Sequence, residues 1–152
     1  MGDTGNIWQD ALDSMAAHLD TQKATWEIKS VYPYPAYAGI GAPINSVCLE
    51  ISPDTSCHLE MFGDGWTVRE HIGMRLTYLS PAITQYKQYA DVLTTLRKII
   101  IYLVQHPVPD GFGSVLSWGN LQIGELPTAA TTKIFIASVD VVLEILKHYT
   151  EG

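Results

Sequence analysis

The segment at residues 66–78, WTVREHIGMRLTY, alternates apolar and polar side chains more regularly than any other part of the chain. Its even-numbered positions are apolar except for Glu70, so six of the seven suit a buried face. Successive side chains of a β-strand point to opposite faces, and this period therefore predicts one long strand with one face against a core. We expect Ser80-Pro81 to end that strand and to open a helix.

The residues before this strand predict its hairpin partner. Residues 57–61 alternate again, and Gly63-Asp64-Gly65 separates the two runs. An Asp-Gly pair favours a two-residue type I′ turn, which would place Met61 opposite Val68 and Cys57 opposite Ile72 on the apolar side. A register shifted by one residue would instead set Met61 opposite Thr67, on the wrong face.

Periodicity also defines the remaining elements. Apolar residues at three- and four-residue steps predict helices over residues 7–19 and 86–104, the first capped by Thr4 or Asn6. Strands are expected over residues 26–34, 47–51, 115–123 and 133–145, with loops at 36–45 and 126–132. The apolar face of the second helix is expected to comprise Tyr86, Tyr89, Leu93, Leu96, Ile100 and Leu103.

These elements predict a single α+β domain over residues 1–152. Its sheet is expected to be mainly antiparallel, to contain a long β-hairpin, and to be packed on one face by two helices.

The composition limits the classes of function. The chain has 152 residues, of which 47% are hydrophobic and 16% charged. An average soluble domain has roughly 25% charged residues, so we expect other subunits to cover part of this surface. The net charge of −7 argues against a protein that grips a nucleic-acid backbone, but an acidic wall lets DNA pass without sticking. No secretory signal or membrane-spanning segment is apparent, which predicts a protein that stays in the cytoplasm unless a larger assembly carries it.

The sequence has no recognisable catalytic motif and no metal framework. The glycine segments at 63–65 and 111–113 lack the context of a nucleotide-binding loop, and no serine lies in a GxSxG or triad pattern. Cys48 and Cys57 are expected to be reduced structural thiols, with a bridge between them as the alternative. His58 and His71 face each other in the predicted hairpin but match no metal-binding motif. We therefore expect no enzyme activity, no metal and no cofactor.

The first group of candidate interface residues lies on the hairpin and comprises Glu60, Phe62, Asp64, Arg69 and Glu70. Glu60 and Arg69 are expected to form an ion pair across the two strands. Glu70 interrupts the apolar face opposite Leu59 with no cation beside it, which would be costly inside a core. Either the strand has left the core at this point or Glu70 meets a partner subunit, and a general acid is the third interpretation.

The second group is the aromatic segment Tyr32, Tyr34 and Tyr37, next to Pro33 and Pro35. Aromatic residues are enriched at protein interfaces, so this segment is either a binding surface or a packed loop.

Taken in chain order, these features resemble the tail terminator family of long-tailed bacteriophages, which is similar to neighbouring tail-completion proteins. The shared features are the N-terminal amphipathic helix, the VYPYP segment at residues 31–35, the strand at 47–51 and the long strand opening with GWTV at 65–68. The main helix follows Ser80-Pro81, and the alternating strand at 133–145 comes after a variable segment. The resemblance covers residues 7–145 and lies in the order of elements.

The resemblance implies a homohexameric ring that caps the head-proximal end of the tail tube in the virion. Such a ring stops tube polymerisation, binds the tail tube protein and the head–tail connector or neck protein, and lets genomic DNA pass without sequence-specific binding. It would assemble in the host cytoplasm and contact no membrane. Two alternatives remain open: another neck or tail subunit, such as a connector or tube protein, and a small-molecule-binding or enzymatic α+β domain.

Overall fold

The computed structural model describes residues 6–36, 44–53, 55–62, 65–81, 83, 85–109, 111–126 and 134–150, with the backbone alone described for 57–62, 126 and 147–150. In chain order, its elements are α1 (Ile7–Asp20), β1 (Val31–Tyr32), β2 (Ser46–Ile51), β3 (Ser56–Phe62), β4 (Gly65–Pro81), α2 (Tyr86–Gln105), β5 (Val115–Leu126) and β6 (Ile134–Thr150).

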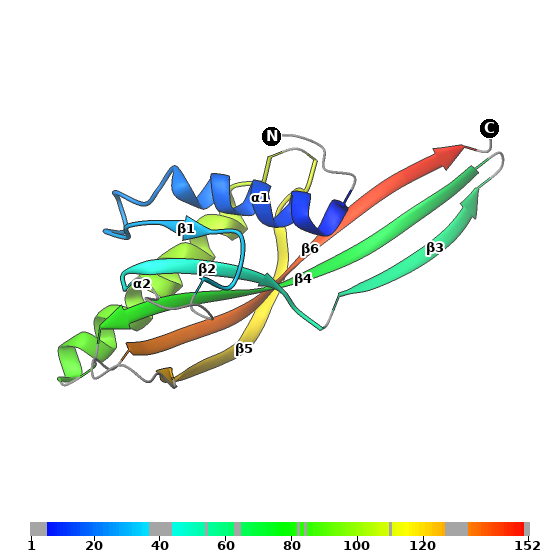
Figure 1. Ribbon diagram of the computed structural model, residues 1–152. Helices are drawn as coiled ribbons and strands as arrows, with labels where there is room; N and C mark the ends of the chain where they lie inside the picture. Colours follow the sequence, from blue (N-terminus) through cyan, green and yellow to red (C-terminus); the bar gives the residue numbers. More distant parts are fainter. Residues whose placement is uncertain are drawn as a thin grey trace.

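All strands join one sheet, in the order β1-β2-β4-β6-β5, and β3 pairs with β4 beyond the end of β2 (Figure 1). Strands β4 and β6 pair along their whole length, from Gly65 opposite Thr150 to Pro81 opposite Ile134. The β1–β2 pair is parallel and the other pairs are antiparallel. The predicted α+β fold with a mainly antiparallel sheet and a long hairpin is confirmed.

Both helices pack on the same face of the sheet. One core cluster joins α1 and α2 to the even-numbered residues of β4 and the odd-numbered residues of β6, including Leu12, Leu96, Met74 and Val139. A smaller cluster of Cys48, Leu79 and Ile134 lies apart from it. Adjacent residues of a strand point to opposite faces, so this second cluster covers the other side of the sheet. Strand β2 is therefore buried on both sides over Ser46–Leu49, whereas the sequence predicted a half-buried strand.

Helix α1 begins where the sequence predicts. The side chain of Asn6, one of the two predicted caps, accepts hydrogen bonds from the backbone N–H groups of Trp8 and Gln9. Leu12, Met15 and Leu19 are buried, as their spacing requires. Trp8 is different, because it is 48% exposed instead of belonging to the core.

The beginning and the buried face of α2 both differ from the prediction. Strand β4 continues through Pro81, so Ser80-Pro81 does not open the helix; Gln85 occupies the N-cap position. Leu96, Ile100 and Leu103 are buried as expected. Tyr86 and Tyr89, however, are 87% and 41% exposed. The buried face of α2 is therefore rotated by part of a turn relative to the predicted face, and it also includes Val92 and Ile99.

The strand predicted at residues 26–34 is reduced to Val31–Tyr32. The chain leaves α1 through a series of turns that ends at Glu27, which has a left-handed φ of 58°. Trp26 is buried by an edge-to-face contact with Tyr102 of α2, with ring centroids 5.3 Å apart, and not by sheet pairing. A large aromatic residue in this segment therefore indicated burial, but not a strand.

The hairpin has a different register from the predicted one. Met61 is opposite Trp66, Glu60 is opposite Thr67, and Cys57 is opposite Glu70, where the sequence predicted Val68, Arg69 and Ile72. Relative to the prediction, β3 is displaced by two residues along β4. Because a strand repeats every two residues, this shift leaves every side chain on its expected face, and alternation alone cannot detect it. Gly65 is paired with Phe62 in the ladder, so the predicted two-residue turn at Asp64-Gly65 is wrong; Gly63 and Asp64 lie outside the described residues.

Gly73 of β4 lies beside the segment that connects the end of β2 to the start of β3, and the two approach each other closely. The backbone N–H of Ser52 donates to the Gly73 carbonyl at 2.8 Å, and the Gly73 N–H donates to the Thr55 hydroxyl at 3.2 Å. A Cβ atom on Gly73 would lie 3.1 Å from the Ser52 Cβ. A side chain at Gly73 would therefore be in tight contact with Ser52, in the segment that connects β2 of the body to β3.

Candidate functional site

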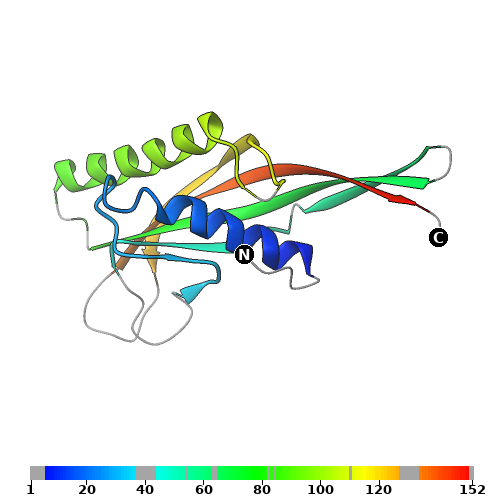
Figure 2. The ribbon, with the colours of Figure 1, turned by 90° about the horizontal axis from the view of Figure 1, so that it is seen from above.

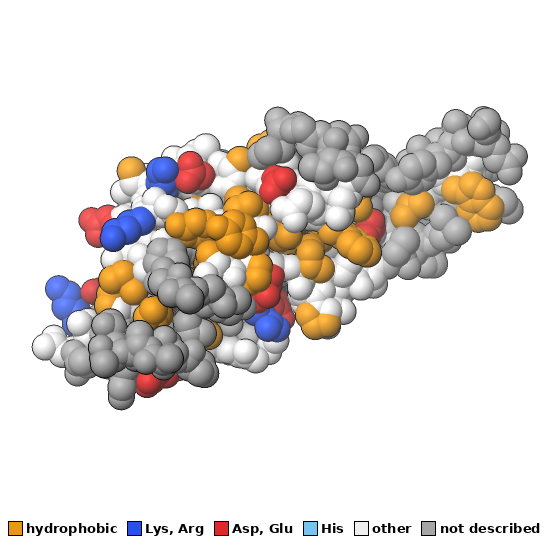
Figure 3. Space-filling view, viewed as in Figure 1, with side chains coloured by type: hydrophobic (Ala, Val, Ile, Leu, Met, Phe, Trp, Pro, Cys, Tyr) orange, Lys and Arg blue, Asp and Glu red, His pale blue; other side chains and the backbone are white. Residues whose placement is uncertain are grey.

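A three-stranded ribbon projects from the body and is here called the arm. It consists of β3, the first residues of β4 and the end of β6, where Gly65–Arg69 of β4 lie between the other two strands. Figures 1 and 2 show the arm extending beyond both helices. Trp66 and Leu146 on it are 37% and 56% exposed, and Figure 3 shows apolar side chains at the surface of the arm. The alternating pattern of β4 therefore extends past the helical layer, and Trp66 and Val68 belong to the arm and not to the buried core.

The arm is tied to the body by Glu70. The indole Nε1–H of Trp8 donates a hydrogen bond to the Glu70 carboxylate. Within the sheet, Glu70 is opposite Cys57 and Ile145, and not opposite Leu59 as predicted. The side chain is half-buried at the edge of the helical layer. The exception in the apolar pattern thus marks the point where β4 leaves the core, and Glu70 has a partner within its own chain.

Charged side chains form a row on the sheet face opposite the helices. Glu144 lies 2.8 Å from the Nε2 atom of His71 and 3.9 Å from the Nε atom of Arg69. Farther along, Asp140 accepts hydrogen bonds from Arg75 at 3.2 Å and from Asn120 at 3.0 Å. Each carboxylate therefore joins neighbouring strands of the sheet.

Two predicted cross-strand oppositions on this face are wrong. Glu60 is opposite Thr67 and not Arg69, and among the described side chains Glu144 on β6 is an acidic neighbour of Arg69. His58 is opposite Arg69, and His71 is opposite Ser56, so the two histidines do not face each other. Both corrections follow from the two-residue displacement of β3. The side chains of Glu60 and Phe62, like all of Asp64, lie outside the described part of the chain.

The aromatic segment lies at the β1 edge of the sheet. The rings of Tyr32 and Tyr34 meet edge to face, with centroids 5.7 Å apart. Tyr32 packs against the smaller core cluster, whereas Tyr34 is 54% exposed. Tyr37 is not among the described residues. The packing of Tyr32 matches the interpretation of this segment as a packed loop. The exposed ring of Tyr34 matches the interpretation as a binding surface.

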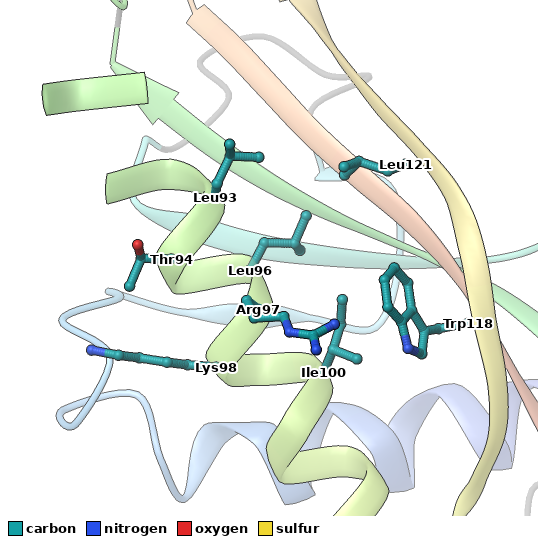
Figure 4. Close-up of a pocket in the computed structure, with 8 residues that line it drawn as sticks. All are labelled: Leu93, Thr94, Leu96, Arg97, Lys98, Ile100, Trp118 and Leu121. Carbon is teal, nitrogen blue, oxygen red and sulfur yellow. The ribbon is translucent and has the colours of Figure 1, made fainter. Parts of the chain in front are cut away.

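An apolar groove runs between α2 and β5 at the opposite edge of the sheet (Figure 4). This α2–β5 groove has a volume of about 410 Å³. Its floor and walls are formed mainly by Leu93, Leu96, Ile100, Trp118 and Leu121, with Arg97 and Lys98 contributed by the helix. The Arg97 guanidinium lies 5.4 Å from the centre of the Trp118 ring, within the range of a cation–π contact.

A β-bulge at Asn120 explains why the groove was not apparent in the sequence. Gly119 and Gln122 are three positions apart in β5, but their partners on β6, Asp140 and Ser138, are only two positions apart. Asn120 lies in this bulge and has a left-handed φ of 58°. Trp118 and Leu121 would point to opposite faces of a regular strand, and the bulge brings both into the groove.

A second, polar cleft lies between α2 and the end of β4, with a volume of about 570 Å³. Its wall includes Tyr78, Asn45, Asp91 and Lys98, and the Tyr78 hydroxyl donates to the Asn45 side-chain carbonyl at 3.4 Å. Burial, and to a smaller extent the charge of Asp91, raise the pKa of the Tyr78 phenol above its ordinary value of 10.0. The cleft therefore holds a neutral phenol beside charged groups of both signs.

Within the described ranges, no three histidine, cysteine, aspartate or glutamate side chains are grouped so that they could hold a metal ion. The Cys48 side chain is buried, and the Cys57 side chain is not described. None of the described helices is both long enough and apolar enough to span a bilayer.

Comparison with known proteins gives no family assignment: no protein-family model and no curated protein sequence matches this chain.

Proposed function

We propose that this protein is a structural subunit of a tailed phage, a tail terminator that forms a ring on the head-proximal end of the tail tube. In this role the ring, expected to be a homohexamer, stops tube polymerisation, joins the tube to the head connector, and remains in the virion. The structural observation that supports the proposal most directly is the projecting arm. The other argument is the resemblance of the sequence to the tail terminator family.

The arm has the properties of a contact element. It extends past the helices and exposes apolar side chains on both faces: Trp66 lies on the face that the helices cover in the body, and Leu146 lies on the opposite face, across from Arg69. Short ribbons need a covered hydrophobic face to be stable in water. Their outer edges also present unpaired backbone groups. Docking this ribbon on the tail tube or on the connector would cover its apolar side chains and pair its edges.

The charge distribution is compatible with a DNA conduit. The chain has a net charge of −7, and the cations Arg69 and Arg75 each lie beside a carboxylate. A wall of this kind repels the phosphate backbone and does not retain it. Passage of DNA through the ring therefore requires no sequence-specific contacts.

Native mass spectrometry and negative-stain microscopy of the purified protein, alone and with tail tubes, test the proposal. We expect closed rings, formed alone or on tube ends, and no further growth of capped tubes. The variant Trp66→Ser/Leu146→Ser should lose tube capping, while Gln105→Ser, an exposed change at the end of α2, should retain it. A strictly monomeric protein that also fails to cap tubes would contradict the proposal.

The two alternatives have distinct signatures. A tube protein would form long polymers by itself, and a connector subunit would bind the head and not the tube. The polar cleft beside Tyr78 favours a small-molecule-binding domain as a second candidate. A thermal-shift screen of nucleotides, sugar phosphates and amino acids tests that candidate: a ligand that stabilises the wild type but not Lys98→Ala, with assembly unchanged, would support it.

A further inference from the structure

The two flanks of the sheet are unlike each other. The β1 edge is accompanied by α1, which contacts β1 and β2, and the β5 edge is accompanied by α2, which contacts β5 and β6. We call these sides the α1 flank and the α2 flank. Because they lie at opposite ends of the strand order, copies placed side by side bring the α2 flank of one against the α1 flank of the next. Such a contact is heterologous, the type that generates rings when the rotation closes.

The α2 flank carries several exposed apolar side chains. Two that line the α2–β5 groove, Trp118 and Leu121, are 43% and 49% exposed, and on the same two elements Ile101, Val104 and Leu116 are 42%, 51% and 58% exposed. Exposed apolar side chains that gather beside a groove mark interaction sites. Strand β5 is interrupted by register shifts at two places, which disfavours the addition of another strand to its edge. The groove is therefore suited to receive side chains.

The charges of the two helices are complementary. Helix α2 has Lys87, Arg97 and Lys98 against Asp91 alone, and both charged residues that line the groove, Arg97 and Lys98, are cationic. Helix α1 has Asp10, Asp13 and Asp20 and contains neither lysine nor arginine. Opposite charges on facing surfaces select the partner and fix its orientation. An acidic helix from another copy therefore matches the basic rim of the groove.

The α1 flank also supplies exposed aromatic rings. Trp8 at the start of α1 is 48% exposed, and Tyr34 after β1 is 54% exposed. Tryptophan and tyrosine commonly anchor interfaces by filling apolar pockets. The α2–β5 groove is a pocket of suitable chemistry, because its lining is mostly aliphatic and aromatic.

We infer that the occupant of the α2–β5 groove is a second copy of this chain, which presents its α1 flank in a head-to-tail contact that closes the ring. The inference rests on the proposed ring, and it assigns the subunit interface to the flanks. The arm is left free for the tube or the connector.

A charge-swap experiment tests this interface. Arg97→Glu/Lys98→Glu should abolish ring formation at the concentration where the wild type forms rings, and so should Asp10→Lys/Asp13→Lys, because each places like charges in contact. We expect at least a tenfold rise in the protein concentration needed for rings, which corresponds to about 1.4 kcal/mol. The variant with all four substitutions should form rings again, and it controls for misfolding because it contains every change.

Mixing the two double variants gives a sharper result. The acidic α2 flank of the first variant complements the basic α1 flank of the second, and the unchanged flanks of the two variants form the wild-type contact. Native mass spectrometry should therefore show rings that contain the two variants in equal numbers, although neither variant forms rings alone.

Two outcomes would overturn the inference in a protein whose wild type forms rings. One is normal rings from either double variant alone, and the other is a folded chain with all four substitutions that forms none. A wild type that neither forms rings nor caps tubes would contradict the proposed function itself, so the two failures are distinguishable.

Discussion

Trp8 donates its indole N–H to the carboxylate of Glu70, a residue 62 positions away in the sequence, and this bond joins helix α1 to the base of the arm. The acceptor is the only non-apolar residue among the even-numbered positions of residues 66–78. Its hydrogen-bond partner, Trp8, lies in the first turn of α1. The bond therefore controls how firmly the arm is held to the body.

Removing either partner should loosen the arm. Trp8→Phe retains an aromatic ring without the donor, and Glu70→Leu removes the acceptor. We expect a coupling free energy of about 0.5–1.5 kcal/mol in a double-mutant cycle measured by urea unfolding. Hydrogen exchange should become faster at residues 65–69 in both variants. Additive effects of the two substitutions would show that the bond contributes nothing.

Gly73→Ala should destabilise the hairpin, because the new Cβ would lie 3.1 Å from the Ser52 Cβ. Overpacking at such a contact costs about 1–3 kcal/mol of the free energy of unfolding. Gly119→Ala is the matched control, since it also lies in a strand but has no heavy atom within 4 Å of the added Cβ. Its effect should stay within about 0.5 kcal/mol. Equal losses in the two variants, measured by chemical denaturation, would contradict the role of Gly73.

Asn120 has two functions that substitutions can separate. Asn120→Gly retains easy access to the left-handed φ of 58° and loses only the 3.0 Å hydrogen bond to Asp140, at a cost of about 1 kcal/mol. Asn120→Ala loses the bond and also strains the backbone, which should cost roughly 1–2 kcal/mol more. Unfolding free energies of the two variants provide the comparison. If Ala is as stable as Gly at this position, the bulge does not depend on backbone strain.

Tyr78 should make the stability fall at alkaline pH. Its pKa is raised only in the folded state, so deprotonation favours the unfolded chain. The stability it contributes is complete below the ordinary phenol pKa of 10.0 and is lost as the pH rises through the raised, folded-state value. As the pH rises above about 9, the wild type should lose more free energy of unfolding than Tyr78→Phe. Parallel curves for the two proteins would show that the folded phenol titrates normally.

Much of the element order was predictable because it depends on local periodicity. The helix at residues 7–19 and the strand at 66–78 were located within a few residues, since their apolar spacing matches one period well. Trp26 and Tyr86 show where this reasoning is insufficient. Trp26 is buried by a ring of α2 and not by a strand, and Tyr86 has an apolar position in the pattern but 87% exposure.

The candidate site was less predictable than the fold. Of the predicted interface residues, Tyr34 exposes its ring and Arg69 and Glu70 lie on the arm and at its base, whereas Tyr32 packs against the smaller core cluster. The α2–β5 groove was missed. Its signal, Trp118 and Leu121 three residues apart in a weakly alternating strand, depends on a bulge that the sequence does not announce. The asparagine that adopts the left-handed conformation is the residue that could have suggested it.

Local patterns in the chain were enough to establish most of the helices and strands and the apolar faces of β4 and β6, because these properties repeat along a short piece of sequence. The hairpin register depends on the three-dimensional packing, since a two-residue displacement leaves all faces unchanged. The partner of Glu70 and the meeting of Trp118 with Leu121 in one groove depend on it too. The first joins residues 62 positions apart, which only the packing of α1 on the sheet brings together, and the second depends on a single extra residue in β5.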